Sequence, residues 1–118
     1  TRIDTRVVAQ RWIEAHVPHG AQVLAESSTP PLPGFAVTPL ALPGPGRAPD
    51  PNRSLARARG RYVLVTGAVA DRVLAAREHY PAEVRFYDDL RRRARLVYRL
   101  EPGGALSGPW VRLYHVAQ

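Results

Sequence analysis

The chain has 118 residues, a length that suits a single domain with one hydrophobic core. It is 45% apolar, which argues against wholesale disorder, and no stretch approaches the roughly 18 consecutive apolar residues of a membrane span. Cysteine is absent, which excludes a disulfide framework, a thiolate nucleophile and a Cys-based zinc site. The net charge is +7 and all 17 basic residues are Arg, as expected from GC-rich coding or from anion recognition, so acidic neighbours such as nucleic acid or anionic lipid headgroups are favoured.

The first predicted element is an amphipathic helix that begins near Asp4 and is ended by Pro18 and Gly20. Asp4, or alternatively Thr1, can accept hydrogen bonds from the free amides of the first turn. We expect the face with helical spacing, and its largest residue above all, to be buried against a sheet; this face comprises Thr5, Val8, Ala9, Trp12, Ile13 and His16. A short strand is predicted next, at 21–25.

The segment 27–53 is rich in proline and is the least regular part of the chain. Eight of the twelve prolines lie between Pro30 and Pro51, which excludes a continuous helix there. The alternating pattern of 35–42 predicts an edge strand, in which Pro39 is tolerable if the position of its missing donor faces solvent. We expect the following stretch, 43–51, to be a loop; a linker between two domains is the alternative.

The second half of the chain carries clearer signals. A short helix is predicted at 54–59, and the apolar run of 62–65 between Gly60 and Gly67 predicts a central strand buried on both faces. A helix is predicted at 69–77, and Pro81 marks the first turn of another. Two alternating strands at 96–100 and 110–116 predict an antiparallel hairpin.

This order of elements predicts one α/β domain over residues 1–118. We expect a compact two- or three-layer sandwich with a mixed sheet of about five strands, carrying a proline-rich irregular insertion at about 27–53. Helix-separated strands in the first part favour parallel pairing, whereas the last two strands favour an antiparallel pair.

No pattern in the sequence predicts a metal site, a cofactor site or a catalytic set. The four histidines do not have the spacing of a metal-binding motif, and Pro18 interrupts the helix between His16 and His19. Asp88 and Asp89 form the adjacent acidic pair, but neighbours on a helix point about 100° apart and do not converge on one substrate atom. We interpret them as solvated charges that pair locally with arginine.

The turn after the central strand offers a candidate contact site. Thr66-Gly67-Ala68 lacks both the dinucleotide fingerprint and the Walker lysine pattern. However, the carboxyl ends of central strands are where α/β folds bind ligands, so Thr66, Asp71 and Arg72 are predicted to contact a ligand or another domain. One alternative function is therefore a self-contained phosphate- or nucleotide-handling enzyme with its crevice beside Thr66, Gly67 and Asp71.

An arginine cluster at the end of the helix that begins near Pro81 is the candidate anion site. Arg91, Arg92, Arg93 and Arg95 are predicted to contact anions or a membrane surface, although cations are also favoured at a solvated helix C-terminus. A basic module that binds anions or nucleic acid is a further alternative. Nucleic acid is the less expected partner, because such binding calls for aromatic residues interleaved with the cations.

Several short motifs follow one another in a recognisable order along the chain. They are Asp4-Thr5-Arg6, Gly60-Arg61-Tyr62, Asp71-Arg72, Tyr80-Pro81, Phe86-Tyr87 and Val111-Arg112-Leu113-Tyr114. In this order they resemble the C-terminal region, outside the membrane, of polytopic glycosyltransferases of the dolichyl-phosphate-mannose protein mannosyltransferase and aminoarabinose transferase group. Ala70, where an aromatic residue is expected, and the proline-rich insertion depart from that pattern.

The resemblance implies that this chain is part of an integral membrane transferase that moves a sugar from a polyprenyl-phosphate donor. The catalytic acid would lie upstream of Thr1, and the present segment would be a non-catalytic domain on the extracytoplasmic face of the membrane, without a cofactor of its own. Its implied partners are the membrane portion of the same polypeptide and, beyond it, anionic lipid headgroups or the acceptor substrate.

Overall fold

The computed structural model describes residues 2–44 and 47–118, so Thr1, considered above as a helix cap, and Pro45-Gly46 of the expected loop lie outside the described residues. The elements in chain order are β1 (Ile3–Asp4), α1 (Thr5–His16), β2 (Gln22–Glu26), β3 (Ala36–Leu40), α2 (Leu55–Ala58), β4 (Tyr62–Thr66), α3 (Gly67–Ala75), the 3-10 turn η1 (Arg77–His79), α4 (Pro81–Arg93), β5 (Arg95–Leu100), β6 (Leu106–Ser107) and β7 (Val111–His115).

Five strands form the main sheet in the order β3-β2-β4-β7-β5. β2 pairs in parallel with both β3 and β4, whereas β7 runs antiparallel to β4 and β5. The predicted mixed α/β fold is therefore confirmed, including the central place of β4 and the antiparallel pairing of the last two long strands. β3 lies at the sheet edge, and Pro39 within it is exposed, as expected for a residue without a backbone donor.

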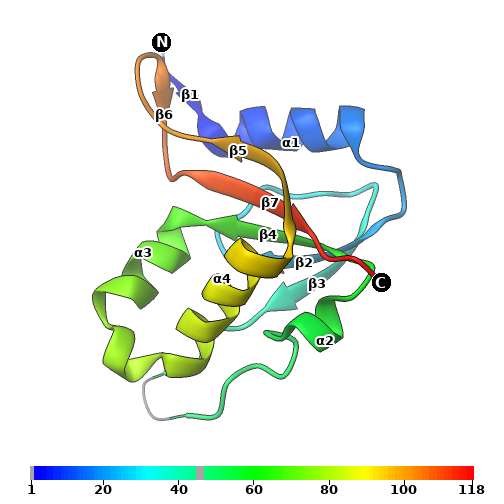
Figure 1. Cartoon of the computed structure of the whole chain (residues 1–118). Coiled ribbons are helices and arrows are strands. Elements are labelled where there is room, and N and C mark those ends of the chain that lie inside the picture. The colour runs from blue at the N-terminus through cyan, green and yellow to red at the C-terminus, as the bar shows by residue number, and fades with distance from the viewer. Residues whose placement is uncertain (1, 45–46) are drawn as a thin grey trace.

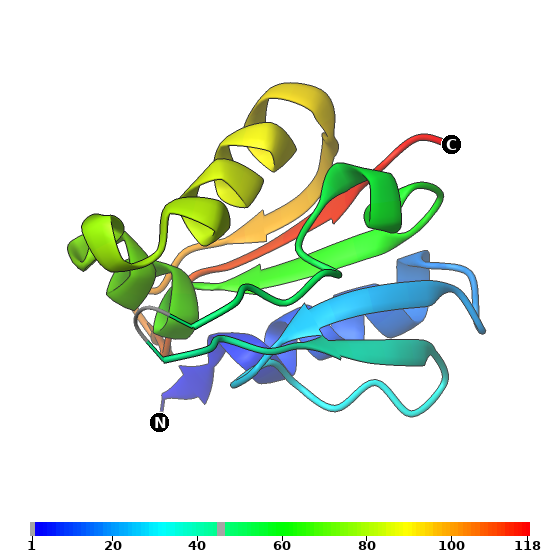
Figure 2. The ribbon, with the colours of Figure 1, turned by 90° about the horizontal axis from the view of Figure 1, so that it is seen from below.

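The sheet separates two layers of helices, so the molecule is a three-layer sandwich (Figures 1 and 2). α1 covers one face, where Ala9, Ile13 and Val17 pack with Leu64 and Leu113 of the central strands. α2, α3 and α4 cover the other face. The core on that side comprises Leu24, Leu40, Ala58, Val63, Val65, Ala70, Phe86, Leu90, Tyr114 and Val116.

The termini of the helices follow the signals in the sequence. Asp4 is the N-cap of α1 and accepts a hydrogen bond from the Arg6 amide at 2.8 Å, and Ser54 and Thr66 cap α2 and α3 through their side chains. Pro81 occupies the first turn of α4, where its missing amide costs nothing. α3 begins at Gly67, earlier than predicted, because Thr66 supplies the cap directly at the end of β4.

The expectation that Trp12 is buried against the sheet is met only in part. The buried residues of α1 are Thr5, Ala9 and Ile13, while Trp12 is half-buried at the edge of this face. Its ring stacks on Tyr98, with 4.4 Å between centroids, and on His16, with 4.3 Å. His16 itself is exposed, so the face that contacts the sheet is narrower than the helical spacing indicated.

A second, two-stranded sheet was not predicted. β1 pairs in parallel with β6, with Ile3 opposite Leu106 and Asp4 opposite Ser107. β6 belongs to the segment that connects β5 and β7, and this segment lies beside the N-terminus (Figure 1). The β1–β6 pairing therefore joins the start of α1 to that connection. Strands of two residues leave no periodicity that could be seen in the sequence.

No helix within residues 2–44 and 47–118 is long and apolar enough to cross a membrane.

Candidate functional site

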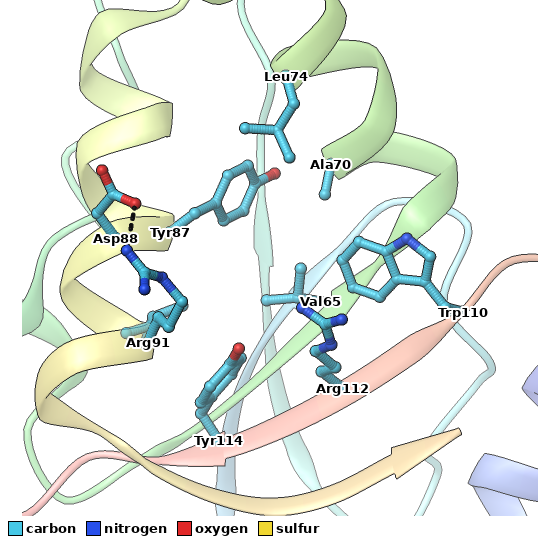
Figure 3. Close-up of a pocket in the computed structure, with 10 residues that line it drawn as sticks. Val65, Ala70, Leu74, Tyr87, Asp88, Arg91, Trp110, Arg112 and Tyr114 are labelled. Atoms are coloured by element: carbon cyan, nitrogen blue, oxygen red, sulfur yellow. Dashed lines mark hydrogen bonds and ion pairs between the residues drawn. The ribbon is translucent and has the colours of Figure 1, made fainter. Parts of the chain in front are cut away.

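A cleft of about 130 Å³ opens on the face of the sheet that carries three helices, between α3, α4 and strands β4 and β7. Figure 3 shows the side chains around it. The floor is aliphatic, and the walls combine aromatic rings with charged groups. The lining residues, called the cleft below, are Val65, Ala70, Leu74, Tyr87, Asp88, Leu90, Arg91, Trp110, Arg112 and Tyr114.

β7 places three of these residues side by side. Side chains of a strand alternate between its two faces, so Trp110, just before β7, points the same way as Arg112 and Tyr114. Val111 and Leu113 point to the opposite face, where they pack in the core beneath α1. The alternation of 110–116, which predicted the strand, therefore also predicts that these three residues share one face.

Trp110 is held in place from three sides. Its indole Nε1 donates a hydrogen bond to Asp71 Oδ1 at 3.1 Å, and the Arg112 guanidinium carbon lies 4.5 Å from the centroid of the ring. Gly67 lies beneath it: a Cβ atom at that position would come within 2.6 Å of Nε1. The ring therefore needs a glycine at the start of α3 in order to lie against the end of β4.

Tyr87 and Trp110 stand on opposite sides of the cleft, with Val65 and Arg112 between them (Figure 3). Arg91 Nη2 pairs with Asp88 Oδ1 at 3.4 Å, and Arg112 Nη2 lies 3.6 Å from Glu101 Oε1. A guanidinium has five N–H donors, so each arginine keeps donors for a further acceptor. The side chains that line the cleft and carry a charge at neutral pH are two arginines and one aspartate, which leaves an excess of one positive charge.

Behind Tyr87 lies a closed group of polar residues, named the Glu26 cluster here: Glu26, Arg53, the Tyr87 hydroxyl and the Thr66 amide. Glu26 Oε2 accepts a hydrogen bond from Arg53 Nη1 at 2.8 Å and another from the Tyr87 hydroxyl, and Oε1 accepts from the Thr66 amide at 3.2 Å. The side chains of Glu26 and Arg53 are both 0% exposed. Burial, and then the negative charge of Glu26, raise the pKa of the Tyr87 hydroxyl well above its usual range.

The carboxylate behind the cleft is already occupied by partners of its own. The buried Glu26 carboxylate has three partners and no path to a substrate, so it cannot serve as an external acid or base. Within the part of the chain that the structure describes, the residues lining the cleft include no histidine, serine or threonine. Across the same described residues, no group of three or more His, Asp or Glu residues is positioned to hold a metal ion.

The residues predicted to contact a ligand or another domain take different roles. Thr66 is fully buried, and its hydroxyl accepts a hydrogen bond from the Ala68 amide at 3.4 Å. Asp71 supports Trp110, and Arg72 is exposed on α3. The alternative enzyme needs a crevice beside Thr66 and Gly67. The Trp110 indole fills this space, because β7 pairs with β4 and places Trp110 at the end of β4.

The predicted arginine cluster is divided between two places. Arg91, Arg92 and Arg93 form the last turn of α4, Arg95 begins β5, and all four are exposed. Of the four, Arg91 lines the cleft. The four arginines thus form an exposed rim beside the cleft, and Arg91 is the member that also lines it.

The sequence did not single out Trp110 and Arg112, which complete the cleft, nor Glu26 and Arg53. The shared face of Trp110, Arg112 and Tyr114 was the available signal. Glu26 and Arg53 lie 27 residues apart with no local pattern joining them.

Compared with known proteins, the chain matches no family model, no curated protein and no solved structure.

Proposed function

We propose that this domain is the non-catalytic, extracytoplasmic accessory domain of a membrane-embedded glycosyltransferase that uses a polyprenyl-phosphate sugar donor. The observation that carries the proposal is the ordered set of motifs and the use the fold makes of them. Tyr62 opens the central strand, Pro81 begins α4 and Phe86 is buried in the core between α4 and the sheet. The final motif, 111–114, is the strand next to β4.

The distribution of acidic groups supports a non-catalytic role. The most buried carboxylate, Glu26, is occupied by an ion pair and two further hydrogen bonds. The carboxylate that lines the cleft, Asp88, pairs with Arg91 and has no second acid beside it among the lining residues. Sugar transfer would then depend on an acid elsewhere in the transferase.

The charge of the domain supports a place beside a membrane. Arg91, Arg92 and Arg93 are exposed in the last turn of α4, and Arg95 is exposed at the start of β5, two residues later in the chain. Each basic residue near an anionic lipid surface contributes on the order of 1 kcal/mol, so the cluster would orient the domain on the headgroups while the membrane portion tethers it.

The coding sequence upstream of Thr1 provides the first test. We expect it to encode many hydrophobic spans continuous with this chain; a complete soluble reading frame there would contradict the proposal.

The second test measures sugar transfer. In the full-length transferase, removal of residues 1–118 should lower transfer from the polyprenyl-phosphate donor, while the isolated domain should release no sugar from that donor. An isolated domain that hydrolyses phosphate esters or nucleotides would instead establish the alternative enzyme, and saturable binding to an oligonucleotide at physiological salt, weakened as salt is added, would establish the nucleic-acid module.

A further inference from the structure

The geometry of the cleft points to a binding site for a small organic anion: an apolar group about the size of one aromatic ring, enclosed between Tyr87 and Trp110, whose carboxylate or phosphate is bound by Arg112 and Arg91. This inference does not depend on the proposed function, because it rests on the cleft alone.

Size and lining define the apolar part of the ligand. A cavity of about 130 Å³ is close to the roughly 150 Å³ of an engineered protein cavity that binds benzene. Val65, Ala70, Leu74 and Leu90 present aliphatic surface to it, and the Tyr87 and Trp110 rings stand on opposite sides (Figure 3). Flat apolar groups are favoured between aromatic rings, because offset and edge-to-face contacts add to the burial of apolar area.

The charged groups define the anionic part. The Arg112 guanidinium carbon lies 4.5 Å from the centroid of the Trp110 ring, and Arg112 Nη2 is 3.6 Å from Glu101 Oε1, longer than a good hydrogen bond. Arg91 is likewise 3.4 Å from its partner Asp88, and its side chain is 66% exposed. A planar guanidinium with free donors recognises carboxylate or phosphate in a bidentate way. We expect Arg112 to contribute more than Arg91, because Asp88 lines the cleft beside Arg91 and partly offsets its charge.

Trp110 supplies the readout. Phenyl phosphate is a suitable probe, and the two indole N–H signals of the chain can be followed together by NMR, with Trp12→Phe to assign them. Trp12 lies on α1, on the opposite face of the sheet, and serves as an internal control. We expect a saturable shift of the Trp110 signal and none for Trp12. For a ligand of this size the dissociation constant should be about millimolar.

Matched variants test the assignment. Arg112→Gln should weaken binding of phenyl phosphate about tenfold and Arg91→Gln somewhat less, as expected for hydrogen bonds to a charged group. Arg92→Gln removes the same charge from the same helix outside the cleft and should change the affinity by about twofold or less. Thermal unfolding of each variant shows whether it remains folded. If Arg112→Gln does not fold, Arg91→Gln still tests whether an arginine of the cleft binds the anion.

Four results would overturn the inference. They are an unchanged Trp110 signal at saturating probe, an equal effect of Arg92→Gln and Arg112→Gln, equally tight binding of the neutral analogue benzyl alcohol, and an equal response to inorganic phosphate. The last three would show, in turn, a general charge effect, no recognition of the anion, and no role for the apolar part.

Discussion

The Glu26 cluster and the cleft are built from the same kinds of side chain, and Tyr87 belongs to both, yet water reaches only one of them. The side chains of Glu26 and Arg53 are 0% exposed, whereas Arg91 is 66% and Arg112 36% exposed. In the closed group the acid accepts hydrogen bonds from Arg53 Nη1 and from the Tyr87 hydroxyl, while Arg53 Nη2 is buried without a hydrogen-bond partner among the described residues. In the open one, each arginine has a distant carboxylate and unused donors. Solvent access, rather than residue type, separates a structural polar group from a candidate binding site.

The largest expected effect comes from breaking the buried ion pair of the Glu26 cluster. Arg53→Ala leaves Glu26 as a buried charge without its ion pair, which should lower the free energy of unfolding by about 3 to 5 kcal/mol. Urea denaturation measures this change. The control is the double variant Glu26→Gln with Arg53→Met, which removes both charges, keeps an amide oxygen as acceptor for the Thr66 amide and the Tyr87 hydroxyl, and should recover most of the lost stability. Equal destabilisation in the single and double variants would show that the pairing is not what matters.

Gly67→Ala connects stability with the cleft. The Cβ atom of the new alanine would lie about 2.6 Å from the Trp110 Nε1, which is too close for a van der Waals contact. The Trp110 ring must therefore move away from the end of β4. Overpacking of this kind costs typically about 1 to 3 kcal/mol. The Trp110 indole signal should shift in the free protein and lose its response to phenyl phosphate. Gly34→Ala, which meets no atom within 4 Å, is the matched control. Unaltered binding in Gly67→Ala would mean that Trp110 is not a wall of the site.

Tyr87 is the residue common to both regions, and we expect its hydroxyl to make the free energy of unfolding fall at alkaline pH. Its pKa is raised above the ordinary value of 10.0 in the folded protein, so above that pH the folded state retains a proton that the unfolded state releases. Its contribution is therefore fully present below about pH 10 and is lost as the pH rises further, by up to about 1.4 kcal/mol per pH unit.

The pH dependence of urea denaturation between about pH 9 and pH 11 tests this prediction. Tyr87→Phe should show a shallower decline than the unaltered chain. Burial also raises the pKa of Tyr98, but Tyr98 is present in both proteins, so the difference reports on Tyr87. Identical slopes would indicate that the Tyr87 hydroxyl is less enclosed than the Glu26 cluster requires.

The smallest effect is expected at the exposed rim. The isolated domain should bind anionic vesicles weakly through Arg91, Arg92, Arg93 and Arg95, and added salt should weaken this binding because the charges are solvated. Co-sedimentation at low and high salt measures it, with all four arginines changed to Gln as the comparison. Binding that resists salt, or that survives the four substitutions, would remove the cluster as a membrane contact.

Local chemistry made much of the fold predictable. The cap at Asp4, Pro81 in the first turn of α4 and the apolar run of β4 each act within a few residues, and each is found where the sequence placed it. The edge position of β3 followed from Pro39 in the same way. The width of the buried face of α1 did not follow, because the crossing of the helix over the sheet, and not its periodicity, leaves Trp12 half-buried.

The sequence by itself determined the α/β class, the approximate strands and helices and the shared face of Trp110, Arg112 and Tyr114, since these depend on neighbours two to four residues away. The tertiary structure alone decided which side chains meet. Trp110 reaches Asp71 across 39 residues, and Glu26 reaches Tyr87 across 61, through the register of β7 on β4 and the packing of α4 on the sheet. No local pattern predicts these contacts between residues that are far apart in sequence, because strand register and the burial of apolar faces depend on the packing of the whole chain. For the same reason, only the fold could show that one arginine–carboxylate pair is sealed and another is open to a ligand.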